Sequence, residues 1–310
     1  MAVAAKPILP RFGAEVSGVD LTKPLSDEDR KALIEAQDRW GVTVHRNTGL
    51  TDETHIAFSR NFGYLEQLPP REGLVHRELF SAGNLTKDGE INRDPGAMVY
   101  RKGDQVWHTD SSFMDLRTSY SMLLAHEVPK VGGATWFADT RSAYEDLPQD
   151  VKDRIENLEC DHTLWWSRKQ GGADLSHDDI NARRKSRHRV VHTHAGSGRK
   201  AVYLGAHAYQ IVGMDWDESR ELIDYLNNFA TQEQYVFNVF YQPGDMVIWD
   251  NLCTYHKGGE FDWNERRDMR RTTVREAAAP ENPDDPFGDL FKEMPAIKPV
   301  SATLETKQEA

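Results

Sequence analysis

Short extended segments, separated by turn residues, run through most of this 310-residue sequence and limit its fold more than any other feature. They are rich in β-branched and aromatic residues, which favour strands. They lie at 42–45, 99–100, 106–113, 120–127, 134–137, 235–241, 246–249 and 271–275. Helical periodicity is found mainly in the first half and in insertions. This order predicts a mainly β fold with helical decorations, built as a β-sandwich or jelly roll.

The expected helices carry recognisable end signals. Ser26 precedes three acidic residues and an apolar-periodic stretch that Gly41 closes, which is typical of a capped helix. Further helices are expected at 51–62, 141–147, 151–158 and 218–229. Residues 1–279 should form a single domain, and the proline-containing, polar stretch 280–310 an arm or partly disordered tail.

Composition excludes several classes of partner. The formal charge of −12 argues against nucleic-acid binding and against an anionic membrane surface, since both require basic patches. No apolar run approaches the roughly 20 residues of a membrane span. The two cysteines are too few for a disulfide framework. The sequence therefore predicts a cytoplasmic protein.

The sharpest chemical motif is the Trp-His-Thr-Asp stretch at 107–110. Side chains alternate along a strand, so His108 and Asp110 would project from one face and could hold one metal ion together. A further histidine from a distant strand would complete a facial triad of two histidines and one carboxylate, which leaves coordination positions open for O2 and a cosubstrate.

A histidine two residues from an acid is a weak signal by itself. The same pattern occurs at His76 and at His177, where surface polar residues explain it better. Cys253 and His256 also have the spacing of a zinc-type pair, but no second pair accompanies them, and a buried core thiol explains Cys253 better.

A second stretch supplies the remaining candidates. His256 follows a predicted strand and turn, so it could close the triad from across a barrel. An arginine cluster comes after it, in which Arg267 and Arg271 would share one face of an extended segment. Inward guanidiniums require anionic partners, and arginine binds carboxylates in a bidentate manner. Surface ion pairs on an acidic protein remain the alternative explanation.

At these residues the sequence resembles the taurine dioxygenase and 2,4-dichlorophenoxyacetate dioxygenase family of Fe(II)/2-oxoglutarate enzymes, especially its herbicide-degrading branch. The resemblance runs from about residue 18 to about residue 276. The motifs that carry it are Trp-His-x-Asp at 107–110, Gly-Gly-x-Thr at 132–135, Thr-His-Ala-Gly-Ser-Gly-Arg-Lys at 193–200, Trp-Asp-Asn at 249–251 and Arg-Arg-x-x-Arg-Arg at 266–271.

The resemblance implies a double-stranded β-helix (jelly roll) and a role for each candidate. His108, Asp110 and His256 would bind Fe(II). Thr135 and Arg267 would bind the distal carboxylate of the cosubstrate 2-oxoglutarate, and Arg271 the acid group of the substrate. O2 would be the oxidant. The expected substrate is a small organic acid, and the herbicide-degrading branch favours an aryloxyalkanoate. A homo-oligomer is also expected.

Three alternatives stay open at this stage. One is an alkylsulfonate dioxygenase or biosynthetic hydroxylase of the same class, another a metal-binding jelly roll without redox chemistry, and the third an inactive binding module. Glu90 and Gln210 depart from the pattern of the herbicide enzyme in regions expected near the substrate, which puts the exact acid in doubt.

Overall fold

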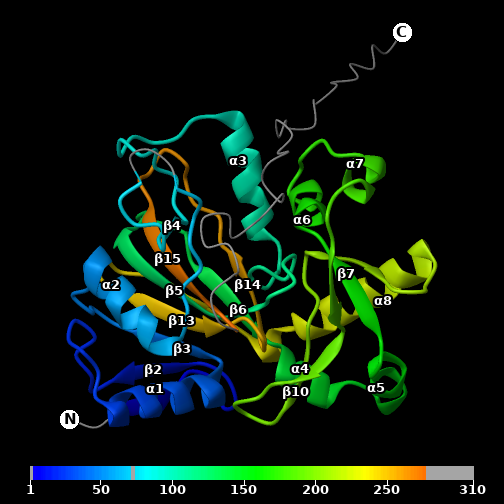
Figure 1. Cartoon of the computed structure of the whole chain (residues 1–310), viewed down its shortest axis with the longest axis horizontal. Helices are drawn as coiled ribbons and strands as arrows, with labels where there is room; N and C mark the ends of the chain where they lie inside the picture. Colours follow the sequence, from blue (N-terminus) through cyan, green and yellow to red (C-terminus); the bar gives the residue numbers. More distant parts are fainter. Residues whose placement is uncertain (1–2, 71–73, 277–310) are drawn as a thin grey trace.

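The computed structural model describes residues 3–70 and 74–276, which form β-sheets faced by α-helices (Figure 1). The largest sheet has seven strands in the order β1-β2-β3-β13-β5-β15-β4. These strands are β1 (Ala4–Pro7), β2 (Ala14–Ser17), β3 (Val42–His45), β4 (Phe80–Ser81), β5 (Thr118–Glu127), β13 (Met246–Asp250) and β15 (Asp268–Arg275). Neighbouring strands are antiparallel except β2 and β3, which run parallel.

A second, three-stranded sheet packs against the inner face of the large one. Its antiparallel strands are β12 (Val236–Val239), β6 (Thr135–Asp139) and β14 (Thr254–Gly258), in that order. Both sheets contribute to one apolar core, with Phe137 and Phe237 from the small sheet and Val247 and Trp249 from the large one. The interior between these two sheets is where the chemistry-bearing residues of the sequence gather.

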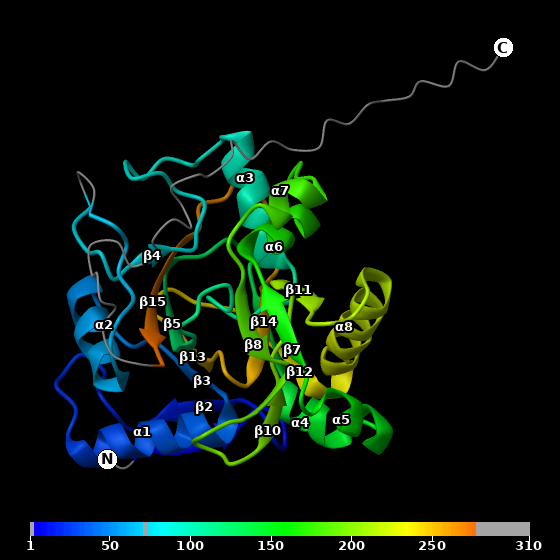
Figure 2. The ribbon, with the colours of Figure 1, turned by 45° about the vertical axis from the view of Figure 1, so that its right-hand side comes forward.

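Helices α1 (Asp27–Trp40) and α2 (Asp52–Ser59) pack on the other face of the large sheet (Figures 1 and 2). Leu123 of β5 belongs to the core between the sheets, and Leu124 to the core beneath the helices. Because both faces of β5 and β13 are covered, β13 and residues 122–125 of β5 are continuously apolar, which is why these strands were predictable.

The remaining elements build a second lobe around two further cores. The residues of the first core lie in or directly next to eight elements. These are α4 (Thr140–Asp146), α5 (Gln149–Ile155), α8 (Trp216–Ala230), β7 (Glu159–His162), β8 (Ser186–Arg189), β9 (Val191–Thr193), β10 (Lys200–Val202) and β11 (Ala208–Ile211). The other brings together α3 (Pro95–Lys102), α6 (Leu164–Gln170) and α7 (His177–Asn181). Short 3-10 turns η1 (Arg60–Phe62), η2 (Gly103–Gln105) and η3 (Glu233–Tyr235) complete the elements.

Most expected elements are present, and the first helix shows why. Ser26 caps α1 by accepting a hydrogen bond from the backbone N–H of Asp29 at 3.0 Å. Gly41 ends the helix in the left-handed conformation at φ 69°, which glycine adopts without steric cost. Helix α2 likewise begins after Thr51, whose side chain forms a capping box with Thr54.

Two expectations were wrong. Residues 99–100 lie in α3, because Asp94 caps the backbone N–H of Ala97 at 2.7 Å and Pro95 is well suited to the first turn of a helix. Residues 106–113 form an isolated bridge and a turn, in which Ser111 has a φ of 54°, instead of a strand. The prediction of a mainly β fold is only partly confirmed, since the described helices contain about as many residues as the strands.

Other expectations concern parts or properties that the structure does not decide. The tail predicted at 280–310 lies outside the described residues, so the single domain over 1–279 and its boundary stay predictions. Within the described ranges, none of the helices has both the length and the apolar character needed to cross a membrane. A cytoplasmic location and a homo-oligomer also stay predictions.

Replacing Gly41 by alanine should destabilise the fold. A Cβ atom there would lie 2.8 Å from Nη2 of Arg141, in addition to about 1–2 kcal/mol for a left-handed residue with a side chain. Gly198→Ala is a matched control, because Gly198 has the same φ of 69° and no atom within 4 Å of the new Cβ. Urea unfolding should show the larger loss for Gly41→Ala, and equal losses would contradict the steric argument.

Candidate functional site

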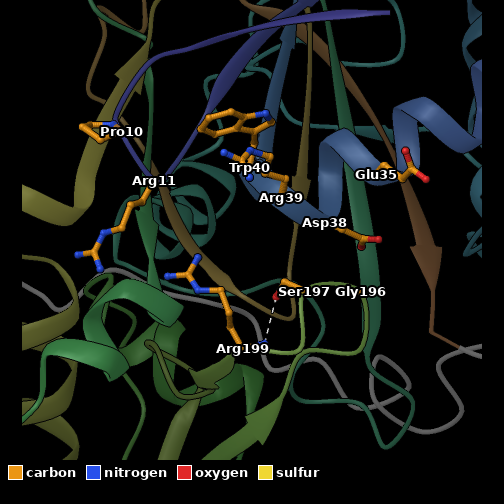
Figure 3. A pocket seen from close by; sticks show the side chains of 9 residues that line it. All are labelled: Pro10, Arg11, Glu35, Asp38, Arg39, Trp40, Gly196, Ser197 and Arg199. Carbon is orange, nitrogen blue, oxygen red and sulfur yellow. Dashed lines mark hydrogen bonds between the residues drawn. The ribbon is translucent and has the colours of Figure 1, made fainter.

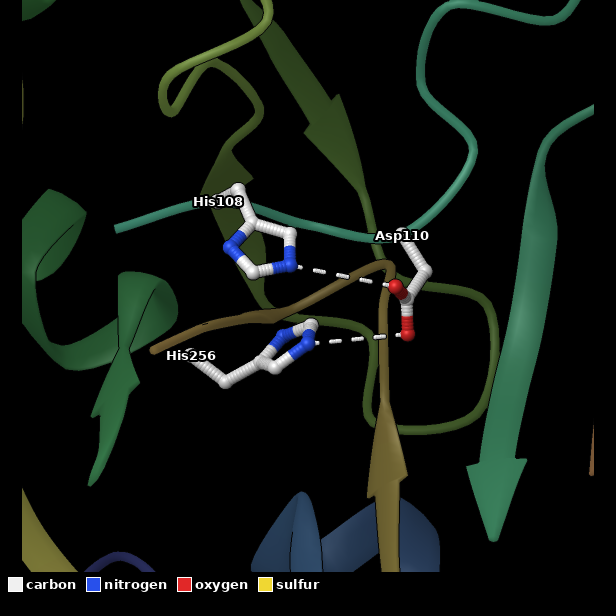
Figure 4. A group of neighbouring side chains, drawn as sticks. All are labelled: His108, Asp110 and His256. Carbon is white, nitrogen blue, oxygen red and sulfur yellow. Dashed lines mark ion pairs between the residues drawn. The ribbon is translucent and has the colours of Figure 1, made fainter. Parts of the chain in front are cut away.

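His108, Asp110 and His256 come together in the interior (Figure 4), although a strand does not carry the first two. An antiparallel bridge joins His108 to His256 of β14, with backbone N–H···O distances of 2.9 and 2.8 Å. Nε2 of His108 and of His256 lie 3.9 and 3.6 Å from the two oxygens of Asp110. Two imidazoles and one carboxylate therefore offer ligand atoms within 4.8 Å of one another, a donor set suited to a divalent metal ion.

The protonation states of these groups suit metal binding. Nδ1 of His108 lies 2.8 Å from the carbonyl oxygen of Val106, so this nitrogen carries a proton, and Nε2 is the ring atom turned towards Asp110. Burial lowers the pKa of His256 to about 3, which leaves its imidazole neutral. Burial opposes ionisation of Asp110, but Arg271 and both histidines outweigh it, so the pKa of Asp110 lies below its usual range.

Asn251 organises the surroundings of the carboxylate. Its side-chain oxygen accepts from the backbone N–H of Asp110 at 3.1 Å and from the indole N–H of Trp249 at 3.0 Å. Its amide group donates to the hydroxyl of Ser121 at 3.0 Å, and that hydroxyl donates to Asp110 at 2.7 Å. Sequence reasoning quoted the Trp-Asp-Asn motif without a role for Asn251, because a buried polar hub has no periodic signature.

A second cluster contains Thr135, Tyr241 and Arg267. The hydroxyl of Tyr241 donates to Oγ1 of Thr135 at 2.9 Å, and Tyr241 is close enough to Arg267 for each to influence the pKa of the other. Arg267 is 8% exposed, and its Nε has no hydrogen-bond partner among the described residues. Burial lowers the pKa of Arg267 to about 10, so it still carries its charge. Such a guanidinium beside two hydroxyl groups forms an anion-binding site.

Arg271 lies next to the converging histidines. Its Nη1 donates to Oδ1 of Asp110 at 2.5 Å, and its Nε lacks a partner within the described ranges. Even spacing places Arg271 on the same face of β15 as Met269, which belongs to the core between the sheets. Arg267 precedes the strand, and the register shifts after Asp268, so the single extended face expected for both arginines is only partly right.

A small apolar cluster borders Arg271. Met114 is buried against Phe80 and Phe113, and the guanidinium of Arg271 lies 5.8 Å from the centre of the Phe80 ring. The Phe113 ring packs edge-on against His207, whose ring is 5.6 Å from that of His108. Apolar surface thus adjoins both a guanidinium and the candidate metal centre.

A second group with potential metal ligands contains His194, Asp250 and Cys253. Nδ1 of His194 accepts from the backbone N–H of Ser197 at 3.1 Å, so its Nε2 carries the proton and donates to Asp250 at 2.8 Å. Burial raises the pKa of Cys253, which keeps the thiol protonated. The hydrogen bonds of His194 and the protonated thiol therefore make this group a poor metal site. The zinc-type pair of Cys253 and His256 considered in the sequence is not formed among the described residues.

A polar hollow near the C-terminal end of α1 is separate from the histidines (Figure 3). It is lined by Pro10, Arg11, Glu35, Asp38, Arg39, Trp40, Gly196, Ser197 and Arg199. Arg11 and Arg199 already pair with Glu145, at 3.3 and 2.6 Å. The hollow shares no residue with the triad or with the anion-binding site around Arg267.

The other residues singled out in the sequence lie apart from the triad. His177 is exposed on α7, and His76 pairs with Glu53 at 3.5 Å, as expected of surface residues. Gln210 donates to the carbonyl oxygen of Met214 at 3.0 Å. Glu90 belongs to a turn that its backbone forms with Thr86. Among the described residues, neither Gln210 nor Glu90 forms a hydrogen bond or an ion pair with Arg271.

Comparison with known proteins agrees with this geometry. Residues 4–273 match the family described as "Taurine catabolism dioxygenase TauD, TfdA family". The chain is 38% identical over 287 residues to an alpha-ketoglutarate-dependent 2,4-dichlorophenoxyacetate dioxygenase of Cupriavidus pinatubonensis, which covers 90% of this chain and 99% of that protein. It is 32% identical over 281 residues to an (S)-phenoxypropionate/alpha-ketoglutarate-dioxygenase of Sphingobium herbicidovorans, covering 86% and 93% respectively.

A solved structure is also similar. The crystal structure of AAD-2 in complex with Mn(II) and N-oxalylglycine superposes with a TM-score of 0.81 at 34% sequence identity. The match covers 91% of this chain and 100% of that one. This degree of similarity extends over nearly all the described elements.

Asn251→Ala should weaken metal binding without removing a ligand. The substitution removes the hydrogen bonds of Asn251 to Asp110, Ser121 and Trp249. It should lower the free energy of unfolding by about 1–3 kcal/mol. Mn(II) affinity should fall by roughly 10- to 100-fold, as is typical when residues that orient metal ligands are lost. Calorimetric titration measures the affinity, and the exposed Asn157→Ala provides a control. Unchanged affinity in Asn251→Ala would mean that the hub does not position Asp110.

Proposed function

Because this chain belongs to the taurine catabolism dioxygenase TauD, TfdA family, we propose that it is an Fe(II)- and 2-oxoglutarate-dependent dioxygenase that hydroxylates an aryloxyalkanoate. The observation that carries the proposal is the convergence of two histidines and Asp110 next to the guanidiniums of Arg267 and Arg271. Each of these arginines keeps a buried Nε with no hydrogen-bond partner among the described residues, which suits the carboxylates of one cosubstrate and one acidic substrate.

The two facing sheets support a double-stranded β-helix as the architecture. Their shared core is closed on one side by β6 and β12 and on the other by β5 and β13. The family membership of the chain points to the same arrangement. In this architecture the candidate residues would occupy one end of the interior.

Fe(II) would be held by Nε2 of His108, Nε2 of His256 and a carboxylate oxygen of Asp110. Three protein ligands leave about three octahedral positions for other ligands. A ferrous ion bound there supplies the activation of O2. The protein's own contribution is to keep the imidazole of His256 neutral by burial and to fix Asp110 through hydrogen bonds with Ser121 and Asn251.

Arg267 and Thr135 would bind the distal carboxylate of 2-oxoglutarate. The unpartnered Nε of Arg267 and the Thr135 hydroxyl are both buried, and an anion would satisfy them. Tyr241, which the sequence did not indicate, would order Thr135 through its hydrogen bond. Binding the far end of the cosubstrate fixes its orientation before reaction.

Arg271 would bind the acid group of the substrate, and the cluster of Phe80, Phe113 and Met114 would contact its aryl group. Trp165 and Tyr209, in contrast, are buried in the core that contains α6 and α7. Hydroxylation of the carbon between the carboxylate and the ether oxygen gives a hemiacetal, which breaks down to a phenol and an oxoacid. This assignment agrees with the substrates named for two relatives.

Arg267→Ala should selectively weaken use of 2-oxoglutarate. Loss of a charged contact worth about 1.5–3 kcal/mol should raise the KM for 2-oxoglutarate by roughly 10- to 100-fold. Succinate release as a function of 2-oxoglutarate concentration measures this. Arg266→Ala is the control, because the neighbouring Arg266 is exposed and pairs with Glu127. A matching rise in the KM for the acid substrate would contradict separate roles for Arg267 and Arg271.

The substrate class is tested by assaying phenol, sulfite and succinate with phenoxyacetates, taurine and simple alkyl sulfonates. We expect phenol from phenoxyacetates. In Arg271→Leu most phenol release should be lost, while uncoupled succinate release persists because Arg267 is intact. Arg270→Leu is the control, since Arg270 pairs with Asp268 at 2.7 Å and also contacts Asp52. Release of sulfite without phenol would refute the aryloxyalkanoate as the substrate, and the assignment as a dioxygenase would still hold.

A further inference from the structure

Asn84 is a buried polar residue to which the proposed reaction assigns no role. It is 2% exposed and lies shortly after β4. Its side-chain oxygen accepts a hydrogen bond from the backbone N–H of Arg267 at 2.9 Å. Its amide group donates to the backbone carbonyl oxygens of Trp263 and Glu265, at 3.1 and 2.8 Å. These partners all lie between β14 and β15, so Asn84 holds the stretch of chain that leads to Arg267.

The backbone around Asn84 runs close along the same stretch. The backbone N–H of Asn84 donates to the carbonyl oxygen of Arg267 at 3.0 Å, and that of Ala82 to the carbonyl oxygen of Met269 at 2.8 Å. The guanidinium of Arg267 donates in return to the carbonyl oxygen of Ala82. A Cβ atom at Gly83 would lie 1.9 Å from the backbone oxygen of Arg267, so a side chain there would push the two segments apart. Both the backbone and the guanidinium of Arg267 are therefore held from this side.

The loop 259–265, which Asn84 anchors, forms a wall of the anion-binding site. The centre of the Phe261 ring lies 5.5 Å from the guanidinium of Arg267. Two backbone hydrogen bonds of 2.9 and 2.7 Å join the start of the loop to residues 133–134, directly before Thr135. The loop thus connects the two sides of the site, and its position decides where the guanidinium lies relative to the hydroxyl group.

We propose that Asn84 is a positioning residue for the cosubstrate. It fixes Arg267 and the loop that carries Phe261, so that the guanidinium is in place before the distal carboxylate of 2-oxoglutarate arrives. This proposal rests on the proposed function, because it needs Arg267 on that carboxylate. A purely structural Asn84 would contribute to stability but would not distinguish a cosubstrate with the distal carboxylate from one without it.

The role of Asn84 can be measured by binding, without turnover. The full-length protein is loaded with Mn(II), and 2-oxoglutarate and 2-oxopentanoate are titrated calorimetrically in the absence of O2. The second compound has the same carbon chain and lacks only the distal carboxylate. Wild type should prefer 2-oxoglutarate. Asn84→Ala should reduce this preference by roughly 5- to 30-fold, because a displaced guanidinium loses part of a charged contact. The affinities for Mn(II) and for 2-oxopentanoate should stay unchanged.

Two further variants separate positioning from stability. Asn61→Ala is the matched control, because the amide group of Asn61 also donates to two backbone carbonyl oxygens, at 3.2 and 2.8 Å, at the end of α2. It should leave the preference for 2-oxoglutarate unchanged. Phe261→Leu removes the ring next to the guanidinium and should reduce the preference by roughly 2- to 10-fold. This variant tests the loop if Asn84→Ala does not fold.

The possible outcomes distinguish this proposal from the proposed function. Equal binding of both compounds by wild type would refute the role of Arg267 on the distal carboxylate, and the role of Asn84 with it. If wild type prefers 2-oxoglutarate and Asn84→Ala keeps that preference, or loses affinity for both compounds equally, the role of Asn84 is overturned and that of Arg267 stands. Should Asn84→Ala not fold, an unchanged preference in Phe261→Leu would overturn the proposal.

Discussion

The interior of this protein depends on the backbone bridge between His108 and His256. Two hydrogen bonds of 2.9 and 2.8 Å join chain segments that are far apart in sequence. Residues 106–113 belong to no sheet, so this bridge and the bond from Asp110 to Asn251 give the segment its position. Without them, alternation along the chain would not bring the two imidazoles to the same carboxylate.

Buried charge is the second constraint on the site. Arg267 is buried, where solvent compensates its charge little, and the side chain of Arg271 is 22% exposed. Asp110 pairs with Arg271 at 2.5 Å and offsets part of this charge. Groups prearranged in this way need no reorganisation when an anion arrives, which favours orientation of both ligands before any bond is broken. The apolar cluster around Met114 adds a surface suited to the rest of an organic acid.

The elements that could be predicted are those with local signals. Helix α1 has a capping serine, acidic residues in its first turn and a terminal glycine. Strand β13 and the middle of β5 are apolar because both faces are covered. Prediction failed at 99–100 and 106–113, where short β-branched or aromatic runs resemble strands. A capping aspartate decides the first case, and in the second the single bridge to β14 does not extend into a ladder before the chain turns at Ser111.

The sequence by itself determined the residue types of the site and their spacing: a histidine two residues before an aspartate, a distant histidine, and arginines eleven and fifteen residues after it. Family resemblance at these motifs assigned the roles. Only the tertiary structure decided which histidine-acid pair meets a third ligand, that the thiol of Cys253 donates to the carbonyl oxygen of Asp250, and that Asn251 and Tyr241 support the site. The reason is physical: caps and periodicity act within a few residues, whereas a buried polar network is satisfied by partners that come together only when distant strands close.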